Sequence, residues 1–139
     1  MPKFTFRLAK LLEYRGLQEK WAKDEYLLCR AKRIEGENQI EGIKHKRATA
    51  MSKNYETIQD KKAQEAFTSR LDDDRRAVEA AVAVLAGEEE VAKQHWLKAK
   101  RDAEALEKLE QKDLEAWSLE ERRNAQKELD EWALRKRAS

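Results

Sequence analysis

Apolar residues in the second half of the chain recur at alternating steps of four and three residues. Steps of seven from Leu71 reach only small or apolar residues as far as Leu106. This spacing keeps one narrow face of a helix turned toward a partner helix over several heptads. The expected seam consists of Leu71, Val78, Val82, Leu85, Ala92, Trp96, Ala99, Ala103 and Leu106.

The first half also has the spacing of a helix, but with a less regular phase. Phe4, Leu8, Leu11 and Leu12 open it, and apolar residues continue at helical spacing as far as Ile43. Each glycine in a helix interior costs about 1 kcal/mol relative to alanine, and three of the four glycines fall in this half. Pro2 stands where a helix start tolerates proline. We predict a helix from about residue 3 to about residue 50.

Two stretches could reverse the chain between these helices. Residues 49–57 are rich in turn and capping residues, and in residues 68–74 Ser69 could cap a helix with Asp72–Asp74 in its first turn. Because Phe67 and Leu71 fit the seam of the second helix, we place the turn at about residues 50–57.

The predicted fold is therefore all-α, a long antiparallel two-helix coiled coil, or helical hairpin, whose second helix is longer than the first. We expect residues 1–139 to form this hairpin as one domain, with the second helix at about residues 57–137. Part of the second helix then needs a partner outside the chain.

Composition and charge agree with this fold. Charged residues make up 42% of the 139 residues, and one proline with four glycines is too few for the turns of a sandwich or barrel. Residues 1–49 carry 12 basic and 7 acidic side chains, whereas residues 71–139 carry 14 and 18. A basic first half and an acidic second half suit two helices lying side by side, and we expect no nucleic-acid partner. We also expect no membrane span and no signal peptide.

No group of residues has the pattern of a catalytic, cofactor or metal site. Cys29 has no histidine at a diagnostic distance in the sequence, so we interpret it as an unreactive thiol. Glu88, Glu89 and Glu90 point around a helix at different angles, which favours a solvated acidic turn over metal ligands. We expect a protein that is not an enzyme and that uses no cofactor, metal or small-molecule ligand.

The four tryptophans have two interpretations. They either fill the seam beside its alanines or, chiefly for Trp117 and Trp132, form exposed anchors for another protein. The basic pairs and triplets near the C-terminus are interpreted as solvated helix faces.

Three segments resemble one family. The opening Lys3-Phe4-Thr5-Phe6-Arg7-Leu8, followed by Leu11-Leu12, resembles the start of FliJ-type flagellar export proteins. The run from Ala105 to Leu109 resembles an internal segment of the same family. The run ERRNAQKELDEWA, which begins at Glu121, is similar to the family's closing pattern R-x-x-Q-K-E-x-D-E-ϕ-A.

This resemblance implies a structural component of the flagellar type III export apparatus, similar to the central stalk of rotary ATPases. The implied partners are the flagellar export ATPase hexamer, the export-gate membrane protein and export chaperones. The implied location is cytoplasmic, with peripheral membrane association at the flagellar base through the export apparatus.

The resemblance also suggests two contact sites. Phe67 and Leu71 match an i,i+4 pair associated with docking on the export gate, although Asp74 and Val78 depart from that pattern. The group expected to face the ATPase consists of Gln126, Lys127, Leu129, Asp130 and Glu131. The alternatives are the equivalent stalk of a virulence-type secretion system and a helical nucleic-acid-binding arm.

Overall fold

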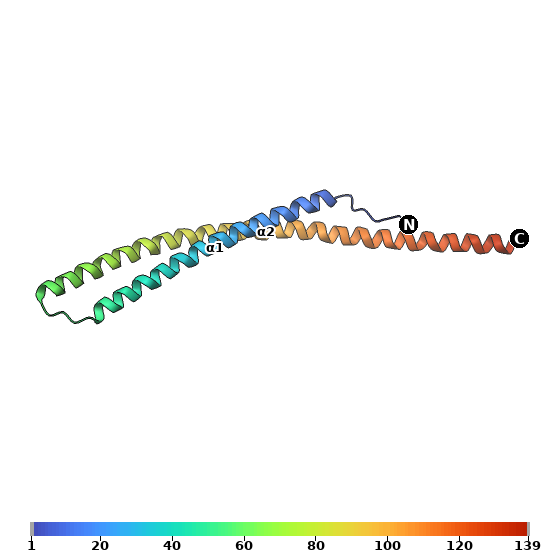
Figure 1. The fold of residues 1–139 in the computed structure, drawn as a ribbon. Helices are drawn as coiled ribbons and strands as arrows, with labels where there is room; N and C mark the ends of the chain where they lie inside the picture. The colour runs from blue at the N-terminus through green and yellow to red at the C-terminus, as the bar shows by residue number, and fades with distance from the viewer. Residues whose placement is uncertain (1, 139) are drawn as a thin grey trace. The chain divides into compact units, whose positions relative to one another are not determined.

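The computed structural model describes residues 2–138. It contains two helices, α1 (Ala9–Ser52, 44 residues) and α2 (Ile58–Ala138, 81 residues), and these described residues form no strand (Figure 1). The prediction of an all-α helical hairpin with a longer second helix is confirmed.

The chain divides into two compact units, and each is described by itself. One unit is Trp21–Leu97, which we call the hairpin unit, and the other combines Met1–Lys20 with Lys98–Ser139, which we call the terminal unit. The expectation that the whole chain is one hairpin domain stays a prediction.

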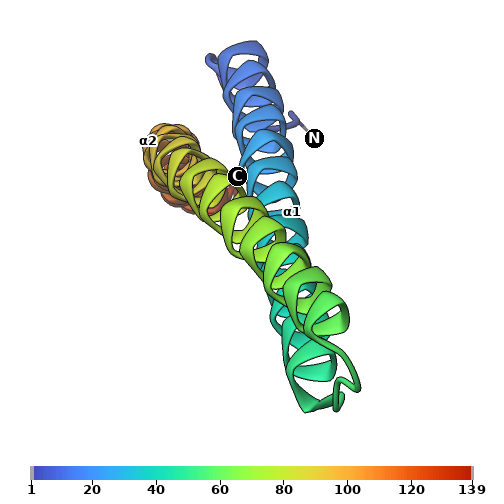
Figure 2. The same ribbon diagram turned by 90° about the vertical axis from the view of Figure 1, so that its left-hand side faces the viewer.

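In the hairpin unit, α1 and α2 run antiparallel on either side of the loop at residues 53–57 (Figure 2). Most of the positions with low exposure alternate at steps of four and three residues on both helices, which is the spacing of a coiled-coil seam. On α1 they are Tyr26, Cys29, Arg33, Gly36, Ile40, Ile43, Arg47 and Ala50. On α2 they are Gln64, Thr68, Leu71, Arg75, Val78, Val82, Leu85, Glu89, Ala92 and Trp96.

Gly36 marks a close approach of the two helices. The residue is buried, and a Cβ atom added to it would lie 2.5 Å from Cγ2 of Val82. At Gly42, by contrast, nothing lies within 4 Å of such an atom. Gly36 lowers the helix propensity of α1, but packing requires a glycine here, because any side chain at this position would collide with Val82.

Side chains on the second side of the loop cap the helix ends that the loop joins, the N-terminus of α2 and the C-terminus of α1. Thr57 Oγ1 accepts a hydrogen bond from the Asp60 backbone N–H at 3.1 Å, so Thr57 is the N-cap of α2. The side-chain amide of Gln64 donates to the carbonyl of Ala50 at 2.7 Å, which satisfies a terminal carbonyl of α1. Residues 68–74, the other turn position considered, lie inside α2.

In the terminal unit, the start of the chain differs from the prediction. Residues 2–6 are not helical, and α1 begins at Ala9 instead of near residue 3. Phe6 is buried, Phe4 is half-buried and Thr5 is exposed. Residues i and i+2 share a side of an extended segment but not of a helix, so a non-helical start allows both phenylalanines to be covered. The Phe4 ring lies 5.9 Å from that of Trp117.

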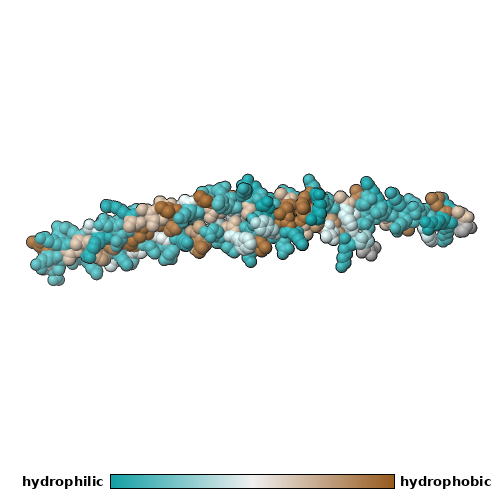
Figure 3. All heavy atoms as spheres, turned by 90° about the horizontal axis from the view of Figure 1, so that it is seen from above, coloured by the Kyte–Doolittle hydropathy of each residue, from teal (hydrophilic) through white to brown (hydrophobic). Residues whose placement is uncertain are grey.

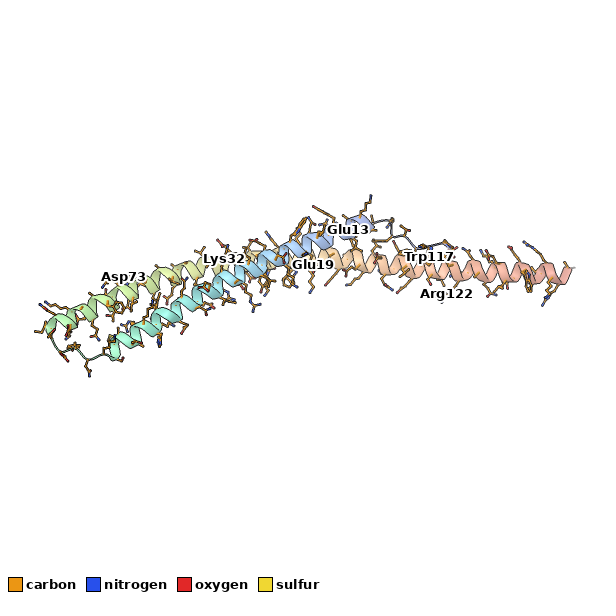
Figure 4. The ribbon with its side chains drawn as sticks, viewed as in Figure 1. Glu13, Glu19, Lys32, Asp73, Trp117 and Arg122 are labelled. Atoms are coloured by element: carbon orange, nitrogen blue, oxygen red, sulfur yellow. The ribbon has the colours of Figure 1, made fainter. Side chains whose placement is uncertain are left out.

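The seam continues along α2 in this unit as far as Trp117, and Ala103 is its most buried residue, with 1% exposed. Farther along α2 the helix becomes exposed on all sides. Every residue from Arg122 to Ala138 is exposed. Figure 4 labels Arg122 at the beginning of this segment, along which no other part of the terminal unit is packed.

Candidate interaction surfaces

Arginines of the first half of the chain pair with carboxylates of α2 in both units. Four such ion pairs are found within residues 2–138, and each joins a basic residue of the first half to an acidic residue of the second. They are Arg7–Asp113 (3.9 Å), Arg15–Asp102 (3.4 Å), Arg47–Asp72 (2.8 Å) and Arg33–Glu89. The opposite charge of the two halves therefore has a structural use, since it aligns the antiparallel segments.

Arg33 and Glu89 form the most buried of these pairs. The guanidinium donates to both carboxylate oxygens of Glu89, whose side chain is 14% exposed, and it also donates to Glu37 at 2.9 Å. The hydrogen bond from Arg33 lowers the pKa of Glu89 below its usual value, although burial acts in the other direction. The prediction of a solvated acidic turn at residues 88–90 is thus wrong for Glu89, because its helical position faces α1.

The tryptophans divide between the two interpretations. Trp96 stacks on Tyr26 with ring centroids 5.5 Å apart, and Trp117 is half-buried against Phe4. Trp21 and Trp132 are instead more than half exposed. Figure 3 shows hydrophobic side chains gathered in patches between hydrophilic ones on the face that it displays.

The two residues expected at the export gate lie differently. Leu71 is a seam residue with 7% exposed, whereas Phe67 is 40% exposed because Thr68 takes the seam position beside it. Phe67 lines a groove of about 270 Å³ near the loop together with Tyr55. Tyr55 was missed by sequence reasoning, and its only signal was an aromatic residue within the predicted turn.

The group expected to face the ATPase lies in the exposed segment of α2. Gln126, Lys127, Leu129, Asp130 and Glu131 are all exposed there. The side-chain amide of Gln126 donates to Asp130 at 3.0 Å. The segment therefore offers polar side chains held by local hydrogen bonds together with an exposed leucine.

Other exposed side chains in this segment were not in the predicted group. Trp132 and Leu134 are both exposed, and the ammonium of Lys136 lies 4.8 Å from the centre of the Trp132 ring. The segment thus presents an aromatic ring with a cation beside it, as the interpretation of Trp132 as an exposed residue expects, in addition to the group expected to face the ATPase.

Cys29 and the acidic clusters lie apart as possible metal ligands within the described residues. Cys29 is buried, and its pKa is raised by burial and by nearby Glu25. In the described part of the chain, no three His, Cys, Asp or Glu side chains gather so that they could hold a metal ion. Neither helix has a stretch within residues 2–138 that is both long and apolar enough to cross a bilayer.

The antiparallel helices and the large apolar side chains that they expose define a class of helical protein, the helical hairpin. A family model described as "Flagellar FliJ protein" matches residues 4–138. The chain therefore belongs to the FliJ family, a structural and non-catalytic family associated with flagellar export. No curated protein and no solved structure matches the chain significantly.

Proposed function

We propose that this protein is a stalk that binds the hexameric flagellar export ATPase, promotes its assembly and turnover, and couples it to the export gate. It works at the flagellar base in the cytoplasm, peripherally associated with the inner membrane through the export apparatus, and it escorts export chaperones. It binds no nucleotide itself.

The observation that carries this proposal is the exposed segment from Arg122 to Ala138. It is a helix with no other described segment packed on it, yet it keeps Leu129, Trp132 and Leu134 at its surface. Binding a partner that covers large apolar side chains is favourable, because it removes their apolar surface from water. A single helix is also narrow enough, at roughly 10–12 Å with side chains, to enter the central opening of a ring.

The proposed gate contact lies in the hairpin unit, near the loop. Phe67 and Leu71 were expected to act there together. We assign the contact to the exposed rings of Phe67 and Tyr55, because the side chain of Leu71 is occupied in the seam. Leu71 then supports Phe67 from within the hairpin.

The stalk proposal is tested by mixing the protein with its cognate ATPase and measuring ring assembly and ATP hydrolysis. We expect the wild-type protein to increase both, and we expect the double variant Leu129→Ala with Trp132→Ala to do so less. The matched control is Leu27→Ala with Ile34→Ala, which also removes two exposed apolar side chains but from α1. No effect of the wild-type protein on either quantity would refute the stalk.

A further inference from the structure

One side of the hairpin unit is hollowed along its length. Three grooves, of about 560, 600 and 450 Å³, follow one another between α1 and α2. Their lining residues repeat at steps of seven, as in Glu25, Lys32, Gln39 and Lys46 on α1 and in Ala77, Val84 and Val91 on α2. Residues seven apart lie on the same side of a coiled-coil helix, so the grooves open on one side. We call this side the grooved face.

The two ends of the grooved face differ in the size of their side chains. Toward one end, Val91 of α2 is more than half exposed, and so is Leu28 of α1, which lies on the same side as Gly42 because it is two steps of seven away. Toward the other end stand Gly42, with nothing within 4 Å of its missing Cβ, and Ala77. The face therefore has large side chains at one end, which we call the bulky end, and small side chains at the other, which we call the hollow end.

The polar side chains at the two ends are also complementary. Glu25 and His95 flank the groove at the bulky end, and Lys46 and Asp74 flank the groove at the hollow end. In each case one residue belongs to α1 and the other to α2.

We propose that the grooved face binds the same face of a second copy of this chain, in an antiparallel dimer. A two-fold axis across the hairpin, near Glu35 and Val84, lays α1 on α1 and α2 on α2 in opposite directions. It places Leu28 at Gly42 of the second copy and Val91 at its Ala77. A two-fold interface repeats each contact, so both hollow ends are filled.

The same axis brings these polar side chains together, and one of the pairs joins opposite charges. Glu25 meets Lys46 of the second copy, and His95 meets its Asp74, while the two Val84 side chains meet at the axis. One contact is unfavourable, because Glu35 meets its own copy. A complex with a helix of another protein would not contain this repulsion between two copies of Glu35. Removing the charge of Glu35 therefore distinguishes the dimer from such a complex. The proposal does not depend on the stalk function.

The test is sedimentation velocity of the full-length protein over a range of concentrations. We expect a monomer–dimer equilibrium whose dissociation constant rises at least about tenfold in Ala81→Glu, because a charge would be buried in the interface. The matched control Ala83→Glu lies on the same helix outside the grooves and leaves the constant unchanged. Circular dichroism checks that both variants remain helical. Glu35→Gln should strengthen the dimer.

Cross-linking tests the direction of pairing. Leu28 and Gly42 are separated by about 21 Å along one helix, so a short bismaleimide cannot join cysteines at both positions within one chain. Leu28→Cys with Gly42→Cys should give covalent dimers, whereas Leu27→Cys with Gly42→Cys should give few. A protein that stays monomeric, or a dimer lost in Trp132→Ala but kept in Ala81→Glu, overturns the proposal.

Discussion

Arg33 and Glu89 join the two helices of the hairpin by a two-pronged ion pair, in which Nε and Nη2 each donate to one carboxylate oxygen. Both residues occupy seam positions, where apolar side chains are the rule. Sliding one helix against the other would separate the pair and leave the carboxylate of Glu89, whose side chain is 14% exposed, without its arginine, at a high cost. The pair therefore fixes the register of the hairpin, and the other arginine–carboxylate pairs agree with that register.

The first prediction concerns the pH dependence of stability. Arg33 lowers the pKa of Glu89 in the folded protein, so the ionised carboxylate stabilises the fold above its unfolded pKa near 4.5. This contribution is lost as the pH falls through the lower folded pKa. Glu89→Gln should lower the Tm at neutral pH. When the pH is then lowered, the Tm of Glu89→Gln should fall less than that of the wild type, because the variant has no carboxylate to protonate at this position. Thermal unfolding followed by circular dichroism measures both.

Glu90→Gln is the control for this prediction. It removes the same charge from an exposed neighbour whose carboxylate accepts a hydrogen bond only from Gln94 among the contacts found. An equal effect of the two substitutions on the Tm at neutral pH would contradict the structural role of Arg33 and Glu89.

The second prediction separates packing from helix propensity. Gly36→Ala should destabilise the protein by about 1–2 kcal/mol, because the new methyl group meets Val82 and the helices have to move apart. Gly42→Ala meets nothing within 4 Å and should stabilise α1 by about 0.5–1 kcal/mol. Urea denaturation of the two variants measures the difference, and a stabilising Gly36→Ala would mean that the close approach is absent.

The third prediction concerns the position of the turn. Thr57→Ala removes the N-cap of α2 and should cost about 1 kcal/mol. Ser69→Ala replaces an exposed residue within α2 by a better helix former, so it should be neutral or slightly stabilising. The free energies of unfolding of the two variants decide between the turn positions, since the opposite order would place the turn at residues 68–74.

The fourth prediction concerns the proposed gate contact. Leu71→Ala should destabilise the hairpin by about 2–4 kcal/mol, because the side chain is buried. Phe67→Ala should change the Tm little but weaken binding to the export-gate protein, since the ring is partly exposed. Binding measured by calorimetry, beside a Tm for each variant, separates the two effects. Unchanged gate binding in both Phe67→Ala and Tyr55→Ala would exclude this surface.

Sequence reasoning chose the members of the α2 seam by hydrophobicity. It assigned Phe67 to the seam, where the structure has Thr68, because a bulky aromatic residue one position away looked like the better core residue. It passed over Glu89 for the same reason, although the heptad spacing from Val82 and Trp96 had placed that residue on the seam. A seam position is set by the geometry of the helix, and a polar residue can occupy it when a partner lies opposite.

The start of the chain shows a second limit. Phe4, Leu8, Leu11 and Leu12 have the spacing of a helix, but Phe4 and Phe6 also have the spacing of an extended segment. Both patterns are present in the sequence. Residues 2–6 are not helical in the structure, where Phe6 is buried and Phe4 lies against Trp117.

The sequence by itself determined the two helices, the greater length of the second and the absence of strands among the described residues, because these follow from local spacing and helix propensity. Its unequal charges also indicated which halves lie together. Only the tertiary structure decided which arginine meets which carboxylate, why Gly36 is needed and which tryptophans are exposed. Those features depend on the register between residues far apart in the chain, and register is fixed by the sum of many contacts that no single helix contains.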